Sequence, residues 1–127
     1  MNKLKLGVIG VGSVVREIYQ YLYFNSHYSE NLEIIAVADP NKEYRNWFCN
    51  KYHIKENFRY ESYEEMIIEC ELDAAHINTP DDLHLEPTLY CLNHGIDVQM
   101  PKPTSKKIKE VHLMIETAKK NNRFFGV

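Results

Sequence analysis

The sequence predicts an α/β fold in which a doubly wound, mostly parallel sheet of six strands is covered by helices on both faces. Short apolar runs alternate with longer segments of helical period from end to end, which is typical of parallel β–α–β units. A glycine-rich turn follows the first apolar run. The 127 residues contain no linker, repeat or low-complexity tract, and 44% apolar with 26% charged residues is the balance of a globular protein. We therefore expect one domain over residues 1–127.

The first half of the chain is expected to form three strands and three helices. The strands are placed at the apolar runs 3–9, 32–38 and 58–60. Along the first helix, apolar side chains recur at helical spacing at Val15, Ile18 and Leu22. Asn41 is expected to cap the second helix, whose apolar face comprises Tyr44, Trp47, Phe48 and Tyr52. The third helix is placed at 62–70.

The second half repeats this alternation. Its strands are placed at 73–78, 96–100 and 124–127. Pro87 fits the first turn of the helix between the first two of these strands, and Gly95 ends that helix. Ser105 opens the last helix, in which the residues expected to face the sheet are Ile108, Val111, Ile115 and Ala118.

Charge and composition exclude several classes of function. The net charge of −3 gives no basic face for a phosphate backbone, so nucleic acid is not expected as a partner. The apolar run 6–15 is short and broken by glycines, which indicates neither an export signal nor a membrane segment. The histidines and the cysteines lack the close spacing of metal sites, the cysteines being Cys49, Cys70 and Cys91. We expect reduced thiols in a cytoplasmic protein that binds a small molecule and no metal.

The turn at Gly10, Gly12, Ser13 and Val14 lies between the first strand and the first helix, where a dinucleotide's pyrophosphate meets free backbone N–H groups and the helix dipole. Gly10 permits a tight turn, and Gly12 lets the backbone approach the phosphates. The third glycine of this fingerprint is replaced by Val15. A plain glycine turn without a ligand is the alternative.

Asp39 ends the second strand, where an acidic residue binds the adenosine ribose of a dinucleotide. A carboxylate there accepts two hydrogen bonds from the vicinal diol and repels a 2′-phosphate. NAD is therefore favoured over NADP as the cofactor. The alternative is that Asp39 merely forms a turn before Asn41.

Ligands of doubly wound sheets gather at the carboxyl ends of the strands, and the loops at 78–84 and 101–103 also follow strands. These loops, together with the glycine turn and Asp39, resemble the glucose-fructose oxidoreductase and inositol dehydrogenase family. The resemblance covers nearly the whole chain. It rests on the segments 7–12, 38–40, 77–80 with His84, Gly95, 102–103 and 125–127.

The resemblance implies a Rossmann domain followed by a C-terminal substrate domain that residues 1–127 do not contain. It also implies that Asn78, Thr79, Pro80 and His84 border the cofactor. Lys102 is expected to contact the cofactor too, and to lie near the reacting carbon as a catalytic residue. Prolines on both sides hold the Lys102 loop with little freedom, and a nicotinium ring would disfavour its ammonium form. His84 could instead be a polar residue at a helix entrance. The family's glutamate before this lysine is replaced by a proline at position 101.

The expected function is hydride transfer between nicotinamide and a secondary alcohol of a sugar, cyclitol or similar polyol, a substrate class that comes from the resemblance alone. The isolated chain is expected to bind cofactor and to be inactive, because hydride transfer needs the substrate held against the ring. A full-length form could also be a homo-oligomer, and the sequence leaves this question open. The alternatives are a non-catalytic dinucleotide sensor and an interaction domain that has lost its ligand.

Overall fold

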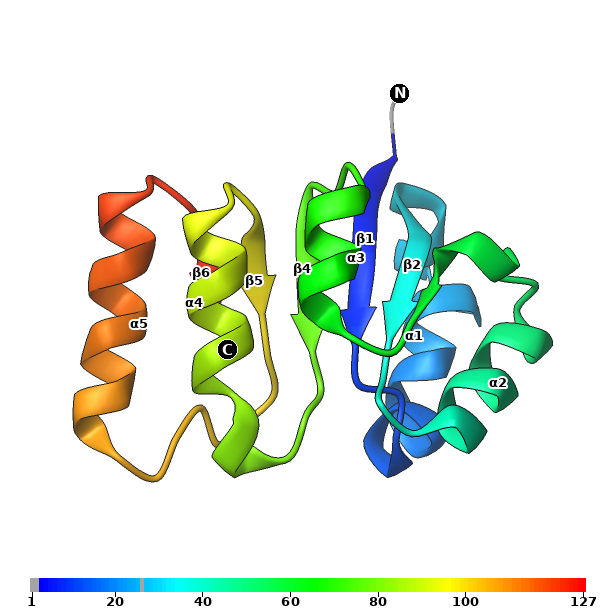
Figure 1. The fold of residues 1–127 in the computed structure, drawn as a ribbon, viewed down its shortest axis with the longest axis horizontal. Coiled ribbons are helices and arrows are strands. Elements are labelled where there is room, and N and C mark those ends of the chain that lie inside the picture. Colours follow the sequence, from blue (N-terminus) through cyan, green and yellow to red (C-terminus); the bar gives the residue numbers. More distant parts are fainter. Residues whose placement is uncertain (1–2, 26) are drawn as a thin grey trace.

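The computed structural model describes residues 3–25 and 27–127, which form a six-stranded, all-parallel sheet in the order β3-β2-β1-β4-β5-β6 (Figure 1). The predicted doubly wound α/β fold is therefore confirmed. The strands are β1 Leu4–Ile9, β2 Leu32–Ala38, β3 Arg59–Tyr60, β4 Ala74–Ile77, β5 Asp97–Gln99 and β6 Phe125–Gly126. The α-helices are α1 Gln20–Asn25, α2 Lys42–Lys51, α3 Tyr63–Glu69, α4 Leu85–Asn93 and α5 Ile108–Lys120. A π-helical turn, Val15–Tyr19, precedes α1, and 3₁₀ turns lie at His27–Asn31, Glu56–Phe58 and Asp81–Leu83.

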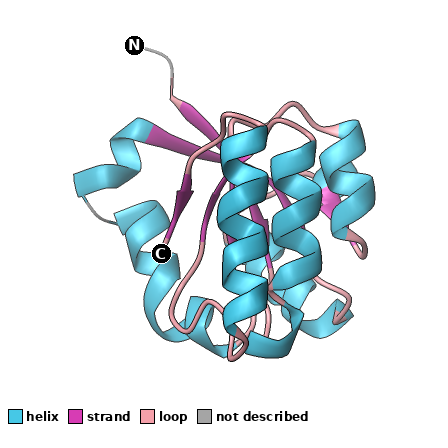
Figure 2. Ribbon diagram, turned by 90° about the vertical axis from the view of Figure 1, so that its left-hand side faces the viewer, coloured by secondary structure: helices cyan, strands magenta, loops and turns pink. Residues whose placement is uncertain are grey.

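Two hydrophobic clusters pack on opposite faces of the sheet, and Figure 2 shows the strands running between helices on both sides. On one face, α3, α4 and α5 contribute Met66, Leu92 and Met114, all 0% exposed. On the other face, Tyr23 of α1 and Phe48 of α2 are buried against β1 and β2. Within the described residues, this second cluster takes no side chain from β5 or β6. The two faces are thus covered unequally.

Three helix ends are formed by local contacts or by a glycine. The Asn41 Oδ1 atom accepts a hydrogen bond from the Tyr44 N–H (3.0 Å), which caps α2 as predicted. The Ser62 hydroxyl accepts from the Glu65 N–H (3.4 Å) at the start of α3. Gly95 follows α4 with a φ of +77°, a left-handed conformation that glycine adopts without strain.

The predicted apolar face of the first helix is wrong beyond Val15. Ile18 is 58% exposed and Leu22 is 39% exposed, whereas Gln20 and Tyr23 are buried. The reason is the π-helical turn, because it uses more residues per turn than an α-helix and so rotates the following residues around the axis.

The last helix begins later than predicted, at Ile108 rather than Ser105. Ile108 is 74% exposed and Ile115 is 38% exposed, so neither faces the sheet as expected. Met114 and Ala118 are the buried residues of this helix.

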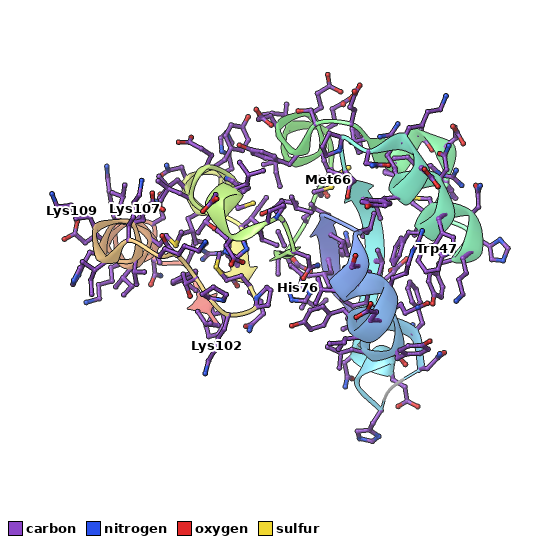
Figure 3. All side chains as sticks on the ribbon, turned by 90° about the horizontal axis from the view of Figure 1, so that it is seen from below. Trp47, Met66, His76, Lys102, Lys107 and Lys109 are labelled. Atoms are coloured by element: carbon purple, nitrogen blue, oxygen red, sulfur yellow. The ribbon has the colours of Figure 1, made fainter. Side chains whose placement is uncertain are left out.

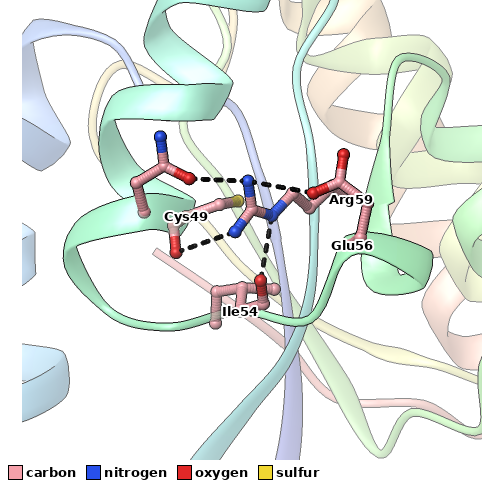
Figure 4. Close-up of polar contacts among 5 residues, drawn as sticks. Cys49, Ile54, Glu56 and Arg59 are labelled. Carbon is pink, nitrogen blue, oxygen red and sulfur yellow. Dashed lines mark hydrogen bonds and ion pairs between the residues drawn. The ribbon is translucent and has the colours of Figure 1, made fainter.

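The border of the sheet at β3 is held by Arg59 (Figure 4). Its guanidinium group donates to the Ile54 carbonyl (2.9 Å), the Cys49 carbonyl (3.4 Å) and the Asn50 side chain (2.8 Å). An ion pair with Glu56 (3.4 Å) completes the set. Arg59 therefore ties the end of α2 to β3, which like β6 at the opposite border is only two residues long.

The three cysteines are free thiols and are buried, as expected for reduced residues of a packed core. Within the described part of the chain, no helix has the length and apolar character needed to cross a membrane.

Candidate functional site

A groove of about 940 Å³ opens where the loops after β1, β2 and β4 meet. Eight of the predicted cofactor-binding residues line it: Gly10, Gly12, Ser13, Val14, Asp39, Asn78, Thr79 and Pro80. Residues that were not predicted as site residues complete the wall, among them Tyr44, Tyr63 and Glu110. Segments far apart in the chain therefore form one continuous surface.

The two glycines of the turn have different surroundings. Gly10 has a φ of +91°, and a Cβ atom there would lie 2.9 Å from the backbone carbon of Asn78. A Cβ atom on Gly12 would meet only the Tyr44 ring, at 3.7 Å. Gly10 is thus required by the fold, whereas Gly12 leaves room in front of the turn for a ligand. This space adjoins the first N–H groups of the helical segment, which have no partner within a helix.

Asp39 is 7% exposed and holds the turn. Its Oδ2 atom accepts from the Val11 N–H and its Oδ1 atom accepts from the Asn41 N–H, both at 2.8 Å. Each carboxylate oxygen can accept a second hydrogen bond, so these contacts leave capacity for a ribose hydroxyl. The turn-forming alternative therefore describes part of the role of Asp39, and ribose binding by this residue stays a prediction.

Asn78 forms part of the groove wall beside the glycine turn. Its Nδ2 atom donates to the Tyr23 hydroxyl (3.2 Å) and to the Gly10 carbonyl (3.5 Å), and the hydroxyl lies 2.6 Å from Nδ1 of His76. The Asn78 Oδ1 atom is buried and has no hydrogen-bond partner among the described residues. Burial lowers the pKa of His76 from 6.5 to about 4.

The sequence did not single out Tyr23 or His76. Their contact is visible only once α1 and β4 are placed together.

His84 is 1% exposed and joins two loops. Its Nε2 atom lies 2.8 Å from the Thr79 carbonyl and its Nδ1 atom 3.0 Å from the Thr104 carbonyl. The imidazole does not line the groove. Contact between His84 and a cofactor stays a prediction, and the observed contacts connect the loop after β4 to the loop after β5.

Lys102 is exposed in the loop after β5 and is not part of the groove wall. Figure 3 shows its side chain on the side of the sheet away from α4. The structure therefore brings the predicted catalytic residue to the same edge of the sheet but separates it from the residues that line the groove.

The groove fits an adenine dinucleotide in two respects. The open space in front of Gly12 is where a pyrophosphate would approach the turn, and the Asp39 carboxylate lies at the end of β2, where a ribose diol would meet it. Asn78 also lines this wall, and its buried Oδ1 atom has no hydrogen-bond partner among the described residues.

Comparison with known proteins agrees with this geometry. Residues 4–127 match the model of an oxidoreductase family with an NAD-binding Rossmann fold. An uncharacterized oxidoreductase of Streptococcus pneumoniae is 28% identical over 96% of this chain and 31% of its own length. An NADP⁺-dependent scyllo-inositol 2-dehydrogenase of Bacillus subtilis is 32% identical over 72% of this chain and 27% of its length.

Among solved structures, myo-inositol 2-dehydrogenase from Lactobacillus plantarum superposes with a TM-score of 0.85 at 25% identity, covering 98% of this chain and 36% of that one. The chain spans about a third of the length of the curated relatives it matches. The match to the family model extends over nearly every residue and includes each loop of the groove. The chain belongs to the oxidoreductase family with an NAD-binding Rossmann fold.

Proposed function

We propose that this chain is the cofactor domain of an NAD-dependent oxidoreductase that acts on a secondary alcohol of a sugar, cyclitol or similar polyol. The observation that carries the proposal is the single groove in which Gly12, Asp39 and Asn78 come together. The substrate class is supported by the inositol dehydrogenases among the relatives.

In this proposal each residue has a defined task. Gly12 admits the pyrophosphate to the backbone N–H groups of the turn, and Asp39 accepts hydrogen bonds from the adenosine ribose. Bound NAD would supply the hydride acceptor. Lys102, which is not part of the groove wall, would orient the substrate hydroxyl and take its proton.

The first test is binding of NADH to the chain. Trp47 packs against Arg16, 4.5 Å from the guanidinium carbon to the ring centroid, and Arg16 also lies over Tyr44 of the groove wall. Energy transfer from Trp47 to bound NADH should therefore give a saturable signal on titration. The absence of saturable binding would defeat the proposal and leave an interaction domain as the conclusion.

The second test concerns the choice between NAD and NADP. Asp39→Asn should weaken NADH binding and reduce the preference for NADH over NADPH, because the variant loses a negative acceptor that repels a 2′-phosphate. Asp73→Asn is the matched control, since Asp73 also accepts a backbone N–H, from Lys5 at 2.8 Å, outside the groove. If the Asp39 variant kept the parental preference, the carboxylate would have only its structural role.

The third test concerns Lys102 in the full-length protein. Lys102→Met should abolish turnover of candidate polyols and leave NADH affinity nearly intact, whereas Lys106→Met should change neither. Unchanged turnover in the Lys102 variant would defeat the catalytic assignment.

A second candidate function is a non-catalytic dinucleotide sensor. The position of Lys102 outside the groove wall and the proline at position 101 favour it. NADH binding without turnover of any polyol by the full-length protein would support the sensor over the enzyme.

A further inference from the structure

Three buried polar side chains connect the inside of the sheet to the glycine turn. Tyr23 on α1, His76 on β4 and Asn78 directly after β4 are 3%, 6% and 8% exposed. His76 and Asn78 are two residues apart, so they lie on the same face of the strand, toward α1. The three side chains form one hydrogen-bonded row that ends at the Gly10 carbonyl.

The Gly10 carbonyl determines the direction of every hydrogen bond in this row. A carbonyl oxygen only accepts, so the Asn78 amide must turn its NH₂ group toward Gly10. The same NH₂ group faces the Tyr23 hydroxyl, which must therefore accept there and donate its own proton elsewhere. Among the described residues, the other hydrogen-bond partner of this hydroxyl is Nδ1 of His76, at 2.6 Å. His76 must then be neutral, with its proton on Nε2.

The electrostatics of the site agree with this arrangement. Burial lowers the pKa of His76 to about 4, which keeps the imidazole neutral at pH 7. Burial also raises the pKa of Tyr23, so its hydroxyl retains the proton that the row requires.

The end of the row is a single peptide unit. The Gly10 carbonyl and the Val11 N–H belong to the same planar peptide. Asn78 binds its oxygen and Asp39 binds its N–H at 2.8 Å. This peptide is therefore held from both sides, and its plane sets the direction in which the chain continues into Gly12.

We propose that Tyr23 and His76 are positioning residues of the dinucleotide site, which fix the Asn78 amide in one orientation and thereby preorganise the Gly10–Val11 peptide for the pyrophosphate. The inference rests on the proposed dinucleotide binding and extends it to two residues that line no part of the groove. Preorganisation of this kind increases affinity for the dinucleotide, because the turn is already ordered before binding and no binding free energy is spent on ordering it.

The first experiment needs no ligand. In a ¹⁵N-labelled chain at pH 7, the imidazole nitrogens of His76 should show an unprotonated Nδ1 and a protonated Nε2. A proton on Nδ1, alone or in an imidazolium, would overturn the proposed direction of the row. This measurement decides the question even where a variant fails to fold.

The second experiment is a double-mutant cycle on NADH affinity. Tyr23→Phe should weaken NADH binding about three- to tenfold, the range expected for one lost hydrogen bond. In an Asn78→Ala background the same substitution should cost less than about twofold, because Tyr23 acts through Asn78. Tyr52→Phe is the matched control. The Tyr52 hydroxyl binds Gln20, which lies on α1 like Tyr23, and Tyr52 lies outside the groove.

The outcomes separate the two proposals. If the unmodified chain does not bind NADH, the proposed function fails. The tautomer measurement alone then decides whether the hydrogen bonds from His76 to Gly10 have the proposed direction. If the chain binds NADH, an unchanged affinity in Tyr23→Phe, or a full effect of this substitution without Asn78, overturns the inference and leaves the proposed function standing.

Discussion

Substituting alanine for each of three glycines should separate what the fold requires from what the ligand requires. A Cβ atom on Gly12 would touch only the Tyr44 ring, at 3.7 and 3.8 Å, which is ordinary contact. On Gly10 it would lie 2.9 to 3.0 Å from backbone atoms of Asn78 and Thr79, at a φ of +91°. Gly95 has a φ of +77° but open space around the added atom. Gly95→Ala therefore isolates the backbone strain that Gly10→Ala combines with overlap.

The expected magnitudes follow from these distances. Gly12→Ala should stabilise the free chain by about 0.4–1 kcal/mol, since the substitution restricts the unfolded chain without strain. Gly95→Ala should lower the free energy of unfolding by about 1–2 kcal/mol for the left-handed conformation. Gly10→Ala should lower it by about 2–5 kcal/mol, because overlap with rigid backbone adds about 1–3 kcal/mol.

Ligand affinity should follow a different order. The methyl group of Gly12→Ala enters the space where a pyrophosphate meets the turn, so NADH affinity should fall at least about tenfold, or about 1.4 kcal/mol. Urea denaturation and NADH titration of the same samples measure both quantities. A Gly12→Ala chain that binds NADH like the parent would refute the placement of the pyrophosphate. A Gly10→Ala chain as stable as Gly95→Ala would refute the overlap with the backbone of Asn78 and Thr79.

Three further predictions concern stability and reactivity. Burial lowers the pKa of His76 from 6.5 to about 4, so the unfolded chain binds more protons than the folded chain between these pH values, and the free energy of unfolding should fall by up to about 3 kcal/mol as the pH drops through this window. Urea denaturation at several pH values should show a smaller decrease for His76→Gln. A decrease equal to that of the parent would contradict the assignment. Arg59→Lys should lower the free energy of unfolding by about 1–3 kcal/mol because the Cys49 and Ile54 carbonyls lose their guanidinium donors. Glu56→Gln should have little effect on the free energy of unfolding, because the Glu56 side chain is 90% exposed. Equal effects of the two substitutions would be inconsistent with these contacts. Cys49 and Cys91 are 0% exposed, and burial raises their pKa values to about 11 and 12. A disulfide reagent at pH 8 should therefore label these thiols only after the chain unfolds. Rapid labelling of the native chain would argue against this packing.

The strands and the loops of the groove could be predicted from the sequence because both follow local rules. The second strand lies at residues 32–38 as predicted, since its apolar run is bounded by polar residues at both ends. Asn41 and Ser62 cap their helices through short-range hydrogen bonds that depend on neighbouring residues only. Parallel strands end at one edge, so loops at 10–14, 39 and 78–80 had to meet.

The helix faces and the supporting polar residues could not be predicted because they depend on tertiary contacts. The π-helical turn at Val15–Tyr19 changes the rotation of α1, and no local pattern announces it. Gln20 is buried, and its side-chain oxygen binds Lys51 at the end of α2 and Tyr52 directly after it, a contact between elements far apart in sequence. The contacts of both His84 ring nitrogens with backbone carbonyls likewise depend on how the loops after β4 and β5 are placed.

The shortness of β3 and β6, two residues each, bears on how the molecules behave at high concentration. A sheet border offers a row of unsatisfied donors and acceptors that another chain can extend into a fibre. Because each border strand is only two residues long, each border offers only a few such groups. Templated stacking of neighbouring molecules is therefore disfavoured by the geometry of the borders themselves.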